Sequence, residues 1–168
     1  MSFCRCNEDV IVKIKKWTEN SKLPTMPKNG DAGVDCYIRC FKSIQKTIKA
    51  TKELNYKKYT LKPLERVLCG LGFATEIPKG CYAKVVPRSG NALWNGLTIL
   101  NTPGTIDCGY RNEWGAIVVN LSNESVELKT GDKICQFIVR KLVDHKVKFV
   151  ETLNESSRGK KGFGSSGK

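Results

Sequence analysis

The chain has 168 residues, 40% of them hydrophobic, which is enough for one globular domain with a core and excludes an intrinsically disordered protein. Its formal net charge of +13 indicates a polyanionic partner such as a nucleotide, a nucleic acid or an acidic surface. Eight cysteines without a C-x-x-C pair, beside a single histidine, argue against a structural zinc site. Without a secretory signal or a membrane-spanning apolar run, we expect a soluble intracellular protein, in the cytoplasm or nucleus, with reduced cysteines.

Short apolar or alternating runs recur along the chain, each of strand length and each bounded by turn residues. Gly70 and Gly72 predict a bend inside the run of residues 66–77. Turn residues at 123–124 and 130–132 predict hairpins. The many short strands favour an all-β fold, a sandwich or a barrel. The predicted strands are residues 10–17, 66–77, 81–86, 97–100, 115–121, 126–128, 134–139 and 147–150.

Helical signals are confined to two places. Residues 89–94 predict one short helix, while residues 43–54 fit either a helix, with Ile44 and Ile48 four positions apart, or a solvated loop. The second place overlaps a lysine-rich segment, residues 42–62, which carries seven lysines against one acid, Glu53. These lysines either keep a solvated face soluble or bind a polyanion, and the sequence leaves both interpretations open.

Residues 154–168 are rich in Gly, Ser and Lys and predict a flexible C-terminal arm that follows a β domain of residues 1–153. Glycines allow backbone N–H groups to converge on an anion. Arg158 offers a fork of donors to a phosphate, and Phe163 offers a flat face to a base. The alternative is a frayed tail without a function.

Four other short segments combine glycines with polar side chains. Asp107 lies in a turn between two predicted strands, where a carboxylate is either a general base for water or a cap of the turn. Arg88, Ser89 and Gly90 end a strand with a cation, a hydroxyl and a glycine, which suits a phosphate. The segments at 32–35 and 131–136 say little by themselves.

In this order, the five segments resemble the five motifs of trimeric dUTPases. Residues 32–35 resemble A-G-x-D, and residues 88–90 resemble R-S-G. Residues 104–111 resemble G-x-I-D-x-x-Y-R, and residues 131–136 resemble G-D-x-I-x-Q. Residues 158–167 resemble the glycine-rich arm R-G-x-G-G-F-G-S-T-G. The resemblance runs from residue 10 to the end, apart from an apparent insertion at about 40–60 within the lysine-rich segment.

The resemblance implies a jelly-roll-like all-β subunit with one short helix, assembled as a homotrimer. Each active site combines motifs of different subunits, and the C-terminal arm crosses to a neighbouring site and closes over the nucleotide. The implied reaction is hydrolysis of dUTP to dUMP and pyrophosphate by attack of water on the α-phosphorus. It keeps dUTP low and supplies dUMP for thymidylate synthesis.

The resemblance also implies a role for each matched residue. Asp107 corresponds to the residue that orients and deprotonates the water, and Arg88 and Gln136 act at the α-phosphate. Asp35 corresponds to the residue that holds Mg²⁺ through water, and Tyr110 to the ring that excludes a 2′-hydroxyl. The other substrate-binding positions are Ser89 and Gly90 at the phosphates, Asn101, Gly104, Thr105 and Ile106 at the uracil, and Arg158, Phe163, Gly164, Ser165 and Ser166 in the arm.

The chain departs from the family pattern at Lys161, Asn112 and Ser166, and none of these changes removes a role. Two rival interpretations stay open. A dCTP deaminase on the same fold uses a carboxylate beside the base, for which Glu113 is the candidate. A binding protein uses the basic insertion to hold nucleic acid through Lys46, Lys49, Lys52, Lys57 and Lys58.

Overall fold

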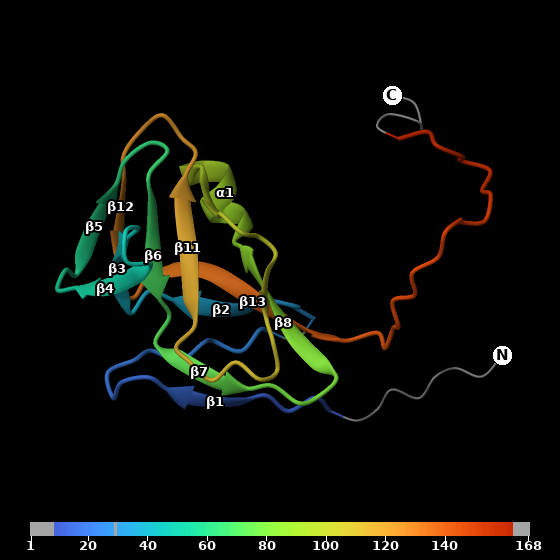
Figure 1. Cartoon of the computed structure of the whole chain (residues 1–168). Coiled ribbons are helices and arrows are strands. Elements are labelled where there is room, and N and C mark those ends of the chain that lie inside the picture. Colours follow the sequence, from blue (N-terminus) through green and yellow to red (C-terminus); the bar gives the residue numbers. More distant parts are fainter. Residues whose placement is uncertain (1–8, 29, 163–168) are drawn as a thin grey trace.

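The computed structural model describes residues 9–28 and 30–162, which form thirteen strands and one helix, so the predicted all-β fold is confirmed (Figure 1). No helix among these residues is both long and apolar enough to cross a membrane. The elements are β1 (Lys13–Lys16), β2 (Val34–Tyr37), β3 (Cys40–Gln45), β4 (Ala50–Leu54), β5 (Lys58–Leu61), β6 (Arg66–Gly70), β7 (Phe73–Glu76), β8 (Cys81–Pro87), α1 (Ser89–Asn95), β9 (Leu97–Ile99), β10 (Gly104–Ile106), β11 (Gly115–Asn120), β12 (Val126–Lys129) and β13 (Lys133–Lys141).

Two antiparallel sheets carry the fold. One has the strand order β10-β8-β13-β2, and the other has the order β4-β3-β6-β11-β9. The pairs β1-β7 and β12-β5 complete the body. Both larger sheets are open at their edges, so the architecture is a sandwich of jelly-roll type and not a closed barrel.

The core contains a cluster of aromatic rings from β7, from β13 and from the residue just before β11. The Trp114 ring centroid lies 5.0 Å from that of Phe73 and 5.1 Å from that of Phe137. All three side chains are almost completely buried. Burial of one such side chain contributes about 1.5–3 kcal/mol. Five cysteines also lie buried in the body as free thiols: Cys36, Cys40, Cys69, Cys81 and Cys135.

The pairing of β8 with β13 sets the geometry of the first sheet. Along β8 the side chains of Cys81, Ala83 and Val85 are buried, whereas the alternate ones are only half-buried. This period of two is typical of a strand with one face on the core. β13 pairs with β8 from Cys135 opposite Pro87 to Lys141 opposite Cys81. The register therefore places the end of β8 beside the beginning of β13.

The predicted bend in residues 66–77 is confirmed and separates β6 from β7. Gly72 has a φ of +78°, and a Cβ built on it would lie 2.9 Å from Ser21 Oγ. Only glycine fits this position without a shift of its neighbours. The two strands that it separates belong to different sheets.

Three sequence predictions were wrong. Residues 43–54 form neither a helix nor a loop but most of the β3–β4 hairpin, because β3 also pairs with β6 and is held in the sheet. Residues 147–150 form no strand in the described chain. The turns at 123–124 and 130–132 connect β12 to strands of other sheets, because β12 pairs with β5. They are therefore turns without hairpins.

After β13 the chain leaves the body and runs away from it in extended form (Figure 1). Several large apolar side chains of this segment are exposed, and Phe149 reaches 94% exposure. Such side chains are normally buried against another surface. The other exposed apolar residues of the segment are Leu142, Val143, Val147, Val150 and Leu153.

Candidate functional site

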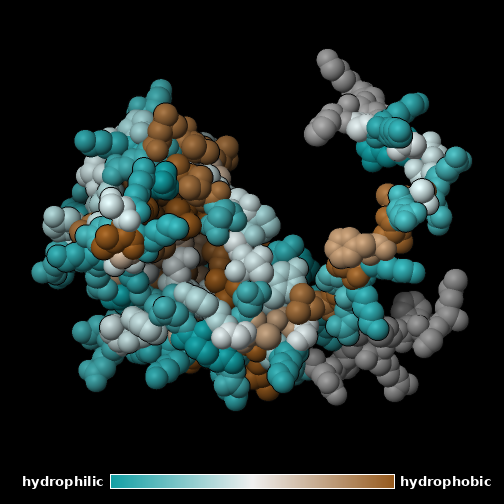
Figure 2. Space-filling view, viewed as in Figure 1, coloured by the Kyte–Doolittle hydropathy of each residue, from teal (hydrophilic) through white to brown (hydrophobic). Residues whose placement is uncertain are grey.

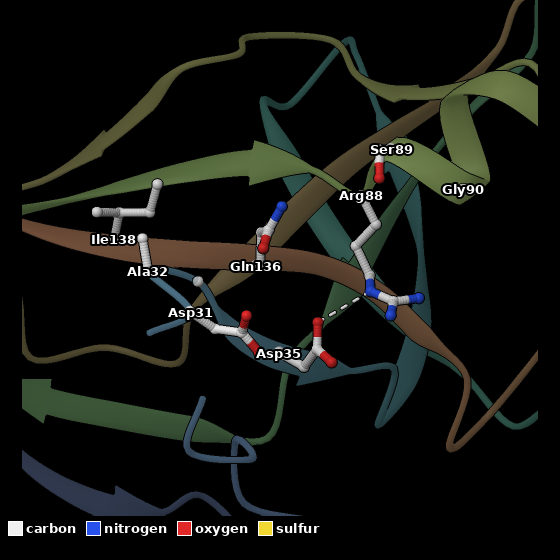
Figure 3. A pocket seen from close by; sticks show the side chains of 9 residues that line it. Asp31, Ala32, Asp35, Arg88, Ser89, Gly90, Gln136 and Ile138 are labelled. Atoms are coloured by element: carbon white, nitrogen blue, oxygen red, sulfur yellow. Dashed lines mark hydrogen bonds and ion pairs between the residues drawn. The ribbon is translucent and has the colours of Figure 1, made fainter. Parts of the chain in front are cut away.

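Three of the five segments meet around one cavity of about 450 Å³ (Figure 3). β13 lies between β8 and β2, and its register sets Gln136 opposite Asp35 on one side and Val86 on the other. The end of β8 then brings Arg88 to the same place. The cavity is lined by Asp31, Ala32, Gly33, Asp35, Arg88, Ser89, Gly90, Gln136 and Ile138.

Two cations hold the Asp35 carboxylate at the edge of this cavity. Arg88 Nε donates to Asp35 Oδ1 at 2.9 Å, and Lys133 Nζ lies 2.8 Å from Asp35 Oδ2. Burial opposes ionisation of Asp35, but the hydrogen bonds from Lys133 and Arg88 outweigh it and lower the pKa of this carboxyl. Asp35 is therefore a charged acceptor at neutral pH.

Gln136 is held between β8 and the segment before β2. Its Nε2 donates to the Pro87 carbonyl oxygen at 3.2 Å, so its Oε1 faces away from β8. A Cβ built on Gly33 would lie 1.9 Å from that Oε1. Glycine at position 33 therefore allows the backbone to approach the Gln136 amide.

The short helix at the cavity is confirmed, with α1 covering Ser89–Asn95. It ends at Gly96, whose φ of +62° suits a glycine C-cap. Asn91 Nδ2 donates to the Lys133 carbonyl oxygen at 3.1 Å and so ties the helix to the beginning of β13. Ser89 and Gly90 remain exposed beside Arg88, where a phosphate can reach them.

The third segment lies elsewhere in the same chain. β10 pairs with β8 from Gly104 opposite Val85 to Ile106 opposite Ala83, so the chain enters the Asp107 turn near Tyr82. Arg88 follows the other end of β8 and lies six residues after Tyr82. At about 3.3 Å per residue the two positions are roughly 20 Å apart. The chain therefore does not bring Asp107 to its own Arg88.

The side chains of the third segment are accessible. Asp107 is exposed, and Tyr110 is 40% exposed while its hydroxyl donates to the Glu113 carbonyl oxygen at 3.2 Å. Asn101 covers Gly104, since a Cβ there would lie 3.1 Å from Asn101 Nδ2. β10 is an edge strand, so one side of Gly104, Thr105 and Ile106 has no strand partner in the described chain.

The fifth segment is only partly described. Arg158 lies in an exposed turn of the extended tail, where its Nε donates to the Lys161 carbonyl oxygen at 3.2 Å. The other predicted residues of the arm lie outside the described residues: Phe163, Gly164, Ser165 and Ser166.

The sequence analysis did not identify Lys133, a partner of the Asp35 carboxylate, or Asp31, which lines the cavity. Lys133 lies inside the fourth segment but carries no signal that pairs it with Asp35, and only the register of β13 against β2 brings them together. Asp31 directly precedes the first segment and lines the same cavity. A second carboxylate so close to Asp35 in the chain was the available signal.

Glu113 is a buried carboxylate that stabilises the fold through ion pairs and a backbone hydrogen bond. Its side chain is 2% exposed and lies 2.7 Å from Arg39 Nε and 2.6 Å from Lys42 Nζ. It also accepts the Gly72 N–H at 3.0 Å. Burial opposes ionisation, but hydrogen bonds from Arg39 and Lys42 lower the pKa of this carboxyl. A carboxylate engaged in this way does not face a base, which argues against the deaminase interpretation.

Comparisons with known proteins agree with one another. The model of the dUTPase family matches residues 54–167. The deoxyuridine 5'-triphosphate nucleotidohydrolase of Clostridium novyi is 39% identical over 154 residues, which cover 92% of this chain and 96% of that protein. The protein of the same name from Clostridium tetani is 40% identical over 160 residues, covering 95% and 99% of the two chains.

Solved structures show the same fold. A mutant dUTPase of Staphylococcus bacteriophage 80alpha with dUpNHpp superposes with a TM-score of 0.74 at 23% identity, covering 94% of this chain and 98% of that chain. A mutant dUTPase from phage phi11 of S. aureus, described with a structural Mg(II) ion, has a TM-score of 0.69 at 19% identity, with 86% and 99% covered.

Proposed function

This chain belongs to the dUTPase family and hydrolyses dUTP, and we propose that it does so at sites shared between the subunits of a homotrimer. The observation that carries the proposal is the single cavity in which Asp35, Arg88 and Gln136 meet. These groups bind phosphates and a cation but include no free base for water. Asp31 also lines the cavity, but we assign it to Mg²⁺ and assign the general base to the residue that the family resemblance implies.

The missing base is Asp107, supplied by a second subunit. Within one chain Asp107 lies roughly 20 Å from Arg88, beyond the reach of any side chain. Rotation of identical subunits about a threefold axis brings the third segment of one chain to the cavity of another. The exposure of Asp107 and Tyr110 suits a site completed in this way.

Exposed apolar surface supports the assembly. On α1, Leu93 is 71% exposed and Trp94 is 80% exposed, and Figure 2 shows hydrophobic side chains gathered over α1 and the neighbouring end of β11. The extended tail after β13 adds Phe149 at 94% exposure. Apolar surface of this kind marks contacts with another chain. We assign the tail to a neighbouring subunit, where it carries the arm with Arg158 to that subunit's site.

The reaction begins when Asp107 orients a water and accepts its proton as the oxygen attacks the α-phosphorus. The bond between the α-phosphorus and the bridging oxygen then breaks, and pyrophosphate leaves. Arg88 and Gln136, with Ser89 and Gly90 beside them, position the phosphates for this attack. In this scheme the arm closes over the nucleotide through Arg158, Phe163, Gly164, Ser165 and Ser166 and excludes bulk water.

The nucleoside is read by the β9–β10 region. The free edge of β10 offers backbone N–H and C=O groups of Gly104, Thr105 and Ile106 to the edge of uracil. Asn101 lies against Gly104 beside them. Tyr110 packs under the sugar and leaves no room for a 2′-hydroxyl, which distinguishes dUTP from UTP.

The donor set of the cavity fits Mg²⁺ bound mainly by water and substrate. The described residues contain no group of three or more His, Cys, Asp or Glu side chains that would enclose a metal. Mg²⁺ needs no such cage, because it keeps several waters and takes one or two carboxylates plus phosphate oxygens. Asp35 and Asp31 are the carboxylates that would hold it, and the ion would neutralise charge on the leaving pyrophosphate.

The test is pyrophosphate release from dUTP, with dCTP, dTTP and UTP in parallel, with and without Mg²⁺. Fast release from dUTP alone that depends on Mg²⁺ supports the proposed reaction and its specificity. Ammonia release from dCTP would instead support the deaminase interpretation. Equal release from all four nucleotides would contradict the roles given to Tyr110 and β10.

A further inference from the structure

A row of lysines follows the free edge of the second sheet, whereas the strands of the cavity described above belong to the first. β4 is the edge strand of this sheet, and it runs from the β3–β4 turn to the β4–β5 loop. Lys49 precedes β4, Lys52 lies within it and Lys57 follows it, so the three span eight residues, at most about 26 Å in extended form. Figure 2 shows hydrophilic side chains along this edge of the molecule with some hydrophobic ones among them. We call Lys49, Lys52, Tyr56 and Lys57 the β4 track.

The lysines of the β4 track have no acidic partner among the described residues. The one acid of the surrounding lysine-rich segment, Glu53, is bound by both terminal nitrogens of Arg39 at 2.8 Å. The next acid along the chain, Glu65, accepts from the Tyr59 hydroxyl at 2.6 Å and from the Lys62 N–H at 2.9 Å. The positive charge of the track is therefore left for an external anion.

An exposed aromatic ring lies at one end of the track. Tyr56 is 59% exposed and directly precedes Lys57. A positively charged line with an aromatic side chain is the combination that binds single strands, through phosphate contacts and stacking of a base. A linear track suits a linear polyanion better than it suits the plane of lipid headgroups.

We propose that the β4 track binds single-stranded nucleic acid, with its lysines at the phosphates and Tyr56 stacked on a base. The track lies on the other larger sheet from Asp35, Arg88 and Gln136, so binding there leaves the hydrolytic site open. Catalysis and strand binding then occur together on one protein.

The test measures fluorescence anisotropy of a labelled single-stranded oligonucleotide with the full-length protein over a range of salt. The variant Lys49→Gln/Lys52→Gln/Lys57→Gln removes three phosphate contacts. At about 0.7 per contact, the slope of log K against log salt falls by about 2, and affinity at 0.1 M salt falls roughly 100-fold. Tyr56→Ala weakens binding of the single strand at least about fivefold and leaves duplex binding nearly unchanged.

The matched control is Lys15→Gln/Lys79→Gln/Lys141→Gln. It removes the same net charge from three exposed lysines around the first sheet and the β1–β7 pair, and it retains strand binding. Both triple variants should hydrolyse dUTP at the unaltered rate, which verifies their folding. Equal loss of binding in both would reduce the effect to net charge and overturn the proposal.

Two further outcomes would also overturn it. Displacement of the oligonucleotide by saturating dUTP would place the strand in the hydrolytic site. If the oligonucleotide showed no salt-dependent binding, the lysines would instead serve to prevent edge-to-edge pairing, the other role of charged residues on edge strands.

Discussion

A mixture of two inactive variants should recover activity if the sites are shared between subunits. Asp107→Asn removes the general base, and Arg88→Gln removes a phosphate ligand from the cavity. Each homotrimer should be slower than the unaltered enzyme by about a hundredfold or more. In a mixed trimer, some sites receive an intact Asp107 from one chain and an intact Arg88 from another.

The expected recovery follows from the roughly 20 Å that separates the two positions along β8. When the two residues of a site come from different chains, random assembly of equal amounts gives both intact in about a quarter of the sites. The mixed sample should therefore show about a quarter of the activity of the unaltered enzyme. If both residues of a site came from one chain, no intact site would form.

The assay is pyrophosphate release after the two variants are unfolded in urea and refolded together. Native mass spectrometry verifies that mixed trimers have formed. The control mixes Arg88→Gln with Gln136→Ala, two residues of one cavity, and should stay inactive. Mixed trimers of Asp107→Asn and Arg88→Gln without recovered activity would refute the shared site, and recovery in the control would refute the geometry of the cavity.

Three other changes test other parts of the structure. Deletion of residues 157–168 should nearly abolish turnover and leave the trimer intact by light scattering; normal turnover would contradict the role of the arm as a lid. Lys133→Gln removes one charged hydrogen bond to Asp35 and should lower kcat about tenfold while Lys133→Arg retains most of it; equal kcat in all three would separate Lys133 from the reaction. Glu113→Gln should cost about 3 kcal/mol of unfolding free energy at pH 7 in urea titrations, because it leaves Arg39 and Lys42 without their buried partner. The pKa of Glu113 is lowered by folding, so its ion pairs stabilise the fold fully above the unfolded value of about 4.3 and lose this effect as pH falls through the lower folded value. The difference between the two proteins should therefore shrink in acid, and a constant difference would contradict the ion-pair explanation.

Turns and the alternation of buried and exposed residues in strands could be predicted from the sequence, because both depend on residues close together in the chain. The alternation along β8, the bend at Gly72 and the short helix after Arg88 each depend on neighbours within a few residues. The five segments were also recognisable as written, because their residues are contiguous. The predicted strands at residues 81–86 and 134–139 accordingly match most of β8 and β13.

The pairing of strands that are distant in the chain could not be predicted from the sequence. The β3–β4 hairpin carries Ile44 and Ile48 at a helical spacing, and its strand form depends on the pairing of β3 with β6. The turns at 123–124 and 130–132 look like hairpin turns, yet β12 pairs with β5. Residues 147–150 are apolar enough for a strand but have no strand partner in the described chain.

The sequence by itself thus determined the all-β class, the position of the helix and the residues capable of the chemistry. Only the tertiary structure decided which of these residues meet: Asp35 with Lys133 and Arg88, while Asp107 stays at the far end of β8. The physical reason is that a side chain's chemistry and its local conformation depend on adjacent residues. Sheet order and register depend on which strands bury their apolar faces together, often across a hundred residues of chain.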